Sequence, residues 1–75
     1  MDIDPRIDEK YIPRILRLVD AHRGKRPVLS ITLTSDNAID VRCGDRLEKG
    51  GSGICLIIGE VNRRWKVTSL SYWIS

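Results

Sequence analysis

Residues 31–43 alternate apolar and polar side chains on both sides of a Ser-Asp-Asn sequence. A period of two residues is typical of a half-buried β-strand, and two such runs joined by a short polar turn indicate a β-hairpin. An amphipathic segment precedes this hairpin, and its apolar side needs the sheet to pack against. The pattern therefore predicts the α+β class, with one N-terminal helix on one face of an antiparallel sheet.

The length of 75 residues limits the chain to one domain. A domain of this size buries only about 60–65% of the surface of its unfolded chain, so a partner subunit, a disulfide or a metal often adds stability. The sequence has no apolar run long enough to cross a bilayer, and its acidic start lacks the apolar core of a signal peptide. We therefore expect a cytoplasmic location and no membrane association.

The expected helix begins near Tyr11 or Ile12 and ends before Gly24, a typical residue at a helix C-terminus. Its apolar residues recur at the spacing of one helix face, and they are Ile12, Ile15, Leu16 and Val19. Leu18 falls off this stripe, so we expect it to be exposed. Residues 1–9 contain four acids and are interpreted as a flexible acidic arm that precedes a single domain of residues 10–75.

Four strands are expected after the helix, in the order α-β-β-β-β, at residues 28–34, 38–43, 54–58 and 65–74. The inward residues of the first two are predicted to be Leu29, Ile31, Leu33, Ile39, Val41 and Cys43. The third strand is apolar on both faces. In the fourth strand, the set Trp65 and Val67 and the set Leu70, Tyr72 and Ile74 fall on opposite faces unless a bulge near Ser69 brings them together. Residues 44–53 contain four glycines and predict a mobile loop.

One helix followed by a four-stranded antiparallel meander resembles the cystatin-like architecture and the related cone fold of the steroid isomerases. The resemblance covers residues 11–75, with residues 59–67 in the place of the final hairpin. The helices that close the pocket of the cone are missing from the sequence, and so is the Gln-x-Val-x-Gly hairpin of cystatins. The resemblance therefore implies an architecture, and no activity, ligand or cofactor follows from it.

Catalytic signatures are missing from the sequence. The glycine-rich residues 50–53 are not followed by the Lys-Ser/Thr pair or the helix of a phosphate loop, and His22 is the only histidine. We therefore expect a non-enzymatic protein with no cofactor and no metal. Cys43 and Cys55 are interpreted as reduced, buried residues, although a cross-strand disulfide between them stays open.

The third and fourth strands carry more apolar surface than a single helix can cover, and uncovered apolar surface is typical of a binding site. The sequence therefore predicts a non-catalytic protein-interaction or regulatory module, self-associating through its sheet as a homodimer. The candidate partner-binding residues are Ile57, Trp65, Tyr72 and Trp73.

The alternative is a module that binds single-stranded nucleic acid. The formal net charge is +3, and exposed aromatic residues beside arginines can stack unpaired bases. The candidate residues for this function are Arg23, Lys25 and Arg26 at the end of the helix, and Arg63, Arg64 and Lys66 at the last turn.

Overall fold

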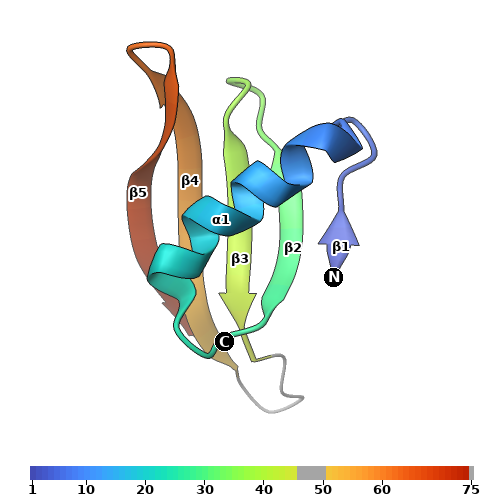
Figure 1. The fold of residues 1–75 in the computed structure, drawn as a ribbon. Helices are drawn as coiled ribbons and strands as arrows, with labels where there is room; N and C mark the ends of the chain where they lie inside the picture. The colour runs from blue at the N-terminus through green and yellow to red at the C-terminus, as the bar shows by residue number, and fades with distance from the viewer. Residues whose placement is uncertain (46–50, 75) are drawn as a thin grey trace.

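The computed structural model describes residues 1–45 and 51–74. A single α-helix packs on one face of a twisted sheet in this part of the chain (Figure 1). The elements are β1 (Asp2–Ile3), the 3₁₀ helix η1 (Glu9–Tyr11), α1 (Ile12–Arg23), β2 (Val28–Leu33), β3 (Ile39–Gly44), β4 (Ser52–Val61) and β5 (Arg64–Ile74). The α+β class is confirmed. The sheet differs from the expected one, because its described part has five strands and is mixed.

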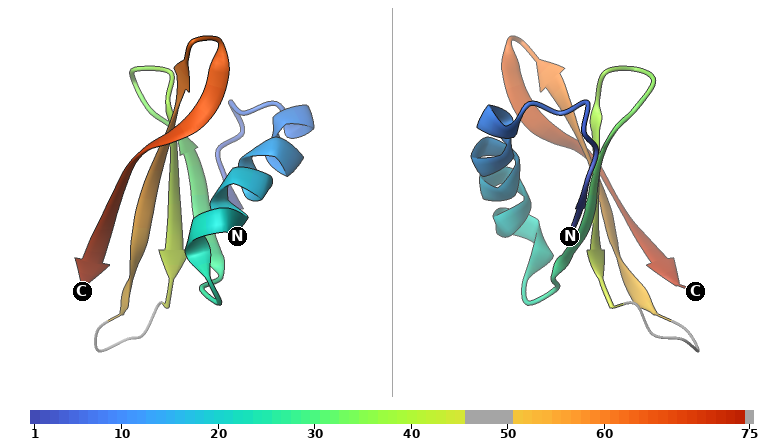
Figure 2. Two further views of the ribbon diagram at one scale, coloured as in Figure 1. Left: turned by 60° about the vertical axis from the view of Figure 1, so that its left-hand side comes forward. Right: turned by 90° about the vertical axis from the view of Figure 1, so that its right-hand side faces the viewer.

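The strands lie side by side in the order in which they occur in the sequence. β1 runs parallel to β2, with Asp2 opposite Ser30 and Ile3 opposite Ile31, whereas the other neighbours are antiparallel. α1 connects the two parallel strands and crosses the sheet diagonally, and the opposite face of the sheet has no helix over it (Figures 1 and 2).

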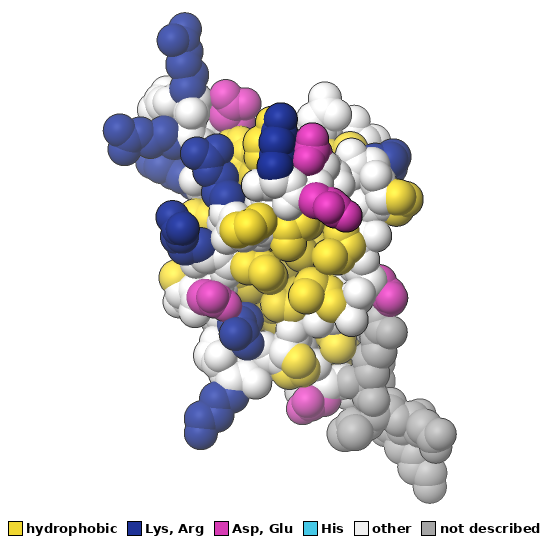
Figure 3. Space-filling model, turned by 45° about the vertical axis from the view of Figure 1, so that its right-hand side comes forward, with side chains coloured by type: hydrophobic (Ala, Val, Ile, Leu, Met, Phe, Trp, Pro, Cys, Tyr) yellow, Lys and Arg dark blue, Asp and Glu magenta, His cyan; other side chains and the backbone are white. Residues whose placement is uncertain are grey.

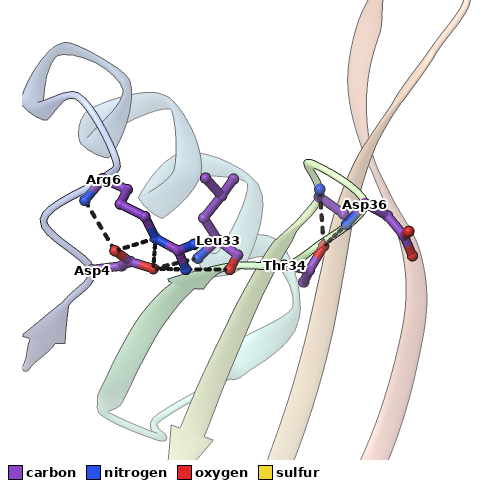
Figure 4. Close-up of polar contacts among 6 residues, drawn as sticks. Asp4, Arg6, Leu33, Thr34 and Asp36 are labelled. Carbon is purple, nitrogen blue, oxygen red and sulfur yellow. Dashed lines mark hydrogen bonds and ion pairs between the residues drawn. The ribbon is translucent and has the colours of Figure 1, made fainter.

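The expectation of a flexible arm over residues 1–9 needs correction. Asp4 accepts a hydrogen bond from the backbone N–H of Leu33 at 3.1 Å and forms an ion pair of 2.7 Å with Arg6. Arg6 in turn donates to the carbonyl oxygen of Leu33 at 2.9 Å, so both side chains close the end of β2 (Figure 4). Ile7 is only 8% exposed and belongs to the core. The segment docks because Asp4 accepts from the backbone of Leu33 and Arg6 donates to it.

α1 begins and ends where the sequence predicts. Pro13 lies in the first turn, and Gly24 follows the last turn with a φ of 63°, a left-handed conformation that glycine adopts without steric cost. Ile15 and Val19 are fully buried, and Ile12 and Leu16 pack beside them. Leu18 differs from its expected exposure: it is half-buried and also packs against the core.

The core lies between α1 and the sheet, and the alternation in the strands places its residues. The fully buried strand residues are Ile31, Val41, Cys43, Ile54, Leu56 and Ile58. The expectation that Leu29 points inward is wrong. A bulge between Val28 and Ser30 leaves Leu29 without a partner on β3, so that Val28, opposite the buried Cys43, packs against the core in its place.

A second bulge divides β5. Ser69 lies opposite Ile57 and Val67 lies opposite Ile58, so Thr68 is the extra residue. Its hydroxyl donates to the carbonyl oxygen of Ile57 at 3.2 Å. The bulge places Trp65 and Val67 on the same face as Leu70, Tyr72 and Ile74. The sequence left this arrangement open with a bulge near Ser69, and the bulge lies one residue earlier.

The connection between β3 and β4 is shorter than the expected loop of residues 44–53. Gly44 is the last residue of β3 and pairs with Gly53 of β4. Residues 46–50 lie outside the described part of the chain, so the expectation of a mobile loop is untested there.

Candidate binding surfaces

The four candidate partner-binding residues do not form one surface. The register places Ile57 and Trp73 on the face of the sheet opposite α1, and Trp65 and Tyr72 on the helix side. Trp73 is half-buried, and its indole N–H donates to the carbonyl oxygen of Ile54 at 3.2 Å. Of these four residues, only Tyr72 is largely exposed, at 76%.

Trp65 has a structural role. Its ring centroid lies 5.1 Å from that of Tyr11, and the guanidinium of Arg14 lies 5.3 Å from the ring. The side chain is half-buried and packs against the core. The indole therefore holds the start of β5 against the N-terminal part of α1, and its ring is occupied by neighbours.

The second half of β5 is the largest exposed apolar element that the structure describes. Leu70, Tyr72 and Ile74 follow one another on the helix side of the strand and are 40%, 76% and 88% exposed. They are exposed because this end of β5 swings away from α1, as both views in Figure 2 show. Leu70 and Ile74 are missing from the candidate residues, although their alternation with Tyr72 is visible in the sequence.

β5 is also an edge strand, and its two halves differ as edges. The first half carries Arg64 and Lys66 and ends at the Thr68 bulge, all of which are features that oppose pairing with another strand. Residues 67–74 contain no charged side chain and no proline. The opposite edge, β1, has only two residues. The second half of β5 is therefore the edge that is best suited to accept another strand.

The uncovered face of the sheet is less apolar than the sequence predicts. Ile57 and Cys55 of β4 are half-buried there, but their neighbours on the adjacent strands are Asp40, Arg42, Ser69 and Ser71. The apolar third strand thus contributes only these two side chains to a polar surface. The stripe of Leu70, Tyr72 and Ile74 lies on the helix side of β5 instead.

The two cysteines are free and lie on opposite faces of the sheet, which excludes a bridge between them in this fold. Burial raises the pKa of the Cys43 thiol. Burial also raises the pKa of Cys55 to about 11, with a further contribution from Asp40, whose carboxylate accepts a hydrogen bond from the thiol at 3.1 Å. Both thiols are thus weak nucleophiles at neutral pH.

The six candidate nucleic-acid-binding residues lie in separate parts of the fold and do not form one surface. Arg23, Lys25 and Arg26 lie at the C-terminal end of α1, where Arg23 pairs with Asp20 at 2.6 Å. Lys66 lies opposite Gly59 on the far face of the sheet.

Arg63 and Arg64 instead line a groove together with Arg14 and Arg17 of α1. Sequence reasoning missed these two helix arginines, although their spacing of three residues places them on one helix face. Figure 3 shows Lys and Arg side chains gathered along one margin of the molecule.

A hollow of about 290 Å³ lies between η1, the β2–β3 turn and the start of β5. The buried Ile7, Ile39 and Ile58 line it together with the exposed Asp8 and Glu60. Its lining in the described chain includes no Ser, Thr, Cys or His side chain. Among the described residues, no three His, Cys, Asp or Glu side chains form a group that could hold a metal ion.

Comparisons of the chain with protein-family models, with curated proteins and with solved structures give no match. None of the helices in the described part has the length and apolarity to cross a membrane.

Proposed function

We propose that this protein is a non-catalytic binding module that self-associates through the second half of β5. The observation that carries the proposal is the exposed stripe of Leu70, Tyr72 and Ile74 on the uncharged second half of an edge strand. An edge strand presents unpaired backbone N–H and C=O groups, and natural proteins commonly protect such edges with charges, prolines or bulges. Charged residues and prolines are missing from residues 69–74, which carry the stripe, and the bulge at Thr68 precedes them.

A second copy of the same chain fits this edge. A two-fold axis through an antiparallel pair of β5 strands makes each interaction occur twice. If the axis passes near Tyr72, Leu70 of one copy lies opposite Ile74 of the other, so the apolar side chains of the two stripes meet. On the far face, this register places Ser71 of one copy opposite Trp73 of the other. The removal of apolar surface from water stabilises such a dimer by about 25 cal/mol for each Å².

Sedimentation equilibrium at micromolar concentration tests the proposal. The wild-type chain should have the mass of a dimer, and Tyr72→Lys should shift it to monomer, because a charge on the edge opposes strand pairing. The matched control is Ile3→Lys, which places the same charge on β1 at the opposite edge, where Ile3 is 43% exposed. A monomeric wild type, or equal dissociation by the two variants, would overturn the proposal.

Single-stranded nucleic-acid binding is the alternative function, and it has less support. The aromatic residue beside Arg63 and Arg64 is Trp65, whose ring already contacts Tyr11 and Arg14. Base stacking needs an accessible aromatic face. Titration of the protein with a labelled single-stranded oligonucleotide at low salt tests this function directly.

A further inference from the structure

Four arginines converge on a groove between α1 and the β4–β5 turn, and we call it the arginine groove. Its lining consists of Arg14, Arg17, Leu18, Arg63, Arg64 and Trp65, and its volume is about 360 Å³. No carboxylate is among these lining residues. In the part of the chain that the structure describes, no ion pair joins any of the four guanidinium groups to an acid. The groove therefore holds positive charge that no described side chain neutralises.

The backbone conformation at Arg63 is unusual for an arginine. Asn62 and Arg63 are the central residues of the β4–β5 turn and have φ angles of 51° and 63°. A two-residue hairpin turn of this kind favours glycine at its second central position, because a residue with a Cβ is strained there. Glycine at position 63 would remove both the strain and one of the four like charges. The arginine is thus present at a cost in stability, which is typical of a residue with a binding role.

Trp65 organises the groove. Its ring holds the Arg14 guanidinium at 5.3 Å and so positions one arginine before any ligand arrives. The Tyr11 ring lies 5.1 Å from the same indole, so two neighbours compete with a nucleobase for the ring. Guanidinium groups bind phosphate through paired N–H donors, so the groove offers phosphate recognition without base recognition.

We propose that the arginine groove binds a short chain of adjacent phosphate groups, as in a polyphosphate or the triphosphate of a nucleotide. The charge density of adjacent phosphates matches that of the four guanidinium groups. A strand of nucleic acid carries one negative charge per nucleotide, so a groove lined by only six residues meets few of its charges. Adjacent phosphates bring several charges into the same volume and satisfy the four guanidinium groups together. This site is separate from the self-association surface.

Isothermal titration calorimetry with inorganic tripolyphosphate tests the proposal at about 0.1 M ionic strength, where distant surface charges are screened. Arg17→Gln and Arg64→Gln should each weaken the affinity by about tenfold, since each removes charge-assisted hydrogen bonds. The matched control is Arg42→Gln, which removes the same charge from the exposed far face of β3 and should change the affinity by less than about twofold.

Arg63→Gly gives a second readout that a purely structural residue would not give. It should weaken tripolyphosphate binding and raise the melting temperature, because glycine adopts the positive φ without strain. The proposal is overturned if tripolyphosphate does not bind, or if Arg42→Gln weakens binding as much as the groove variants. It is also overturned if a single-stranded oligonucleotide binds more tightly than tripolyphosphate and loses affinity with the same substitutions, which would assign the groove to nucleic acid.

Discussion

The indole of Trp73 lies directly over Gly53, its partner in the ladder between β4 and β5. A Cβ atom at Gly53 would clash with the backbone carbonyl oxygen of Cys43 and come within 2.6 Å of Cζ2 of Trp73, distances that side chains do not tolerate. Gly44, the neighbour of Gly53 on β3, lies under the same ring. The two glycines thus form a flat surface that receives the tryptophan, and its indole N–H is bound by the carbonyl oxygen of Ile54.

Gly53→Ala should therefore destabilise the domain by about 1–3 kcal/mol, the usual cost of an inserted methyl group in a packed site. The free energy of unfolding in urea measures this change. Gly59→Ala is the matched control on the same strand, since its Cβ would meet only the Thr68 side chain, whose methyl group lies 3.3 Å away. A loss at Gly53 no larger than the loss at Gly59 would contradict the close approach of both the Cys43 carbonyl and the Trp73 ring to Gly53.

Asp4 predicts a pH dependence of stability. The hydrogen bond from the Arg6 side chain, together with the backbone N–H groups of Arg6 and Leu33, holds the pKa of this carboxyl well below its usual value of 3.8. Because the pKa is lower in the folded state, ionised Asp4 stabilises the fold above that usual value and loses this effect as the pH falls further. Asp4→Asn should lower the melting temperature at neutral pH, and the difference from wild type should shrink below pH 3.8.

Asp36→Asn is the control for this experiment, because Asp36 lies in the exposed β2–β3 turn and its carboxylate makes no contact with Asp4 or Arg6 (Figure 4). Its melting temperature should follow that of wild type at every pH. A constant difference between Asp4→Asn and wild type across the acidic range would contradict the assignment to the Asp4 carboxylate.

The reactivity of Cys55 should depend on Asp40. Burial and the neighbouring carboxylate keep the thiol protonated with a pKa of about 11, so alkylation by iodoacetamide at neutral pH should be slow. Asp40→Asn removes the negative charge, lowers the pKa of Cys55 and should accelerate alkylation. Mass spectrometry distinguishes this site from Cys43, which is fully buried. An unchanged rate in Asp40→Asn would leave burial as the sole cause of the raised pKa.

Local patterns predicted most of this fold. The alternation in residues 31–43 gave the central hairpin, and Gly24 marked the end of α1. In β5, the apolar residues change from odd to even positions after Val67, which indicated where a bulge could lie. β1 could not be predicted, because Asp4 acquires its role from the backbone of Leu33, 29 residues away.

The candidate sites were predicted less well, because contacts between distant segments decide which side chains stay exposed. Trp73 looked available for a partner, but Gly44 and Gly53 create a place for it within the sheet. Arg14 and Arg17 acquire their significance only when the β4–β5 turn folds beside α1. Tyr72 remained exposed because the end of β5 diverges from the helix.

The extra residue at Thr68 also determines which mutations this strand can tolerate. Substitutions at position 68 leave the alternation of side chains along β5 unchanged. Only a short stretch of backbone depends on the Thr68 side chain. Deletion of this one residue would leave Leu70 and Tyr72 on the helix side, because Val67 and Ser69 already pair with the consecutive residues Ile58 and Ile57. The bulge can therefore be lost without a change of faces, and its loss would remove the irregularity that separates the two halves of β5 as edges.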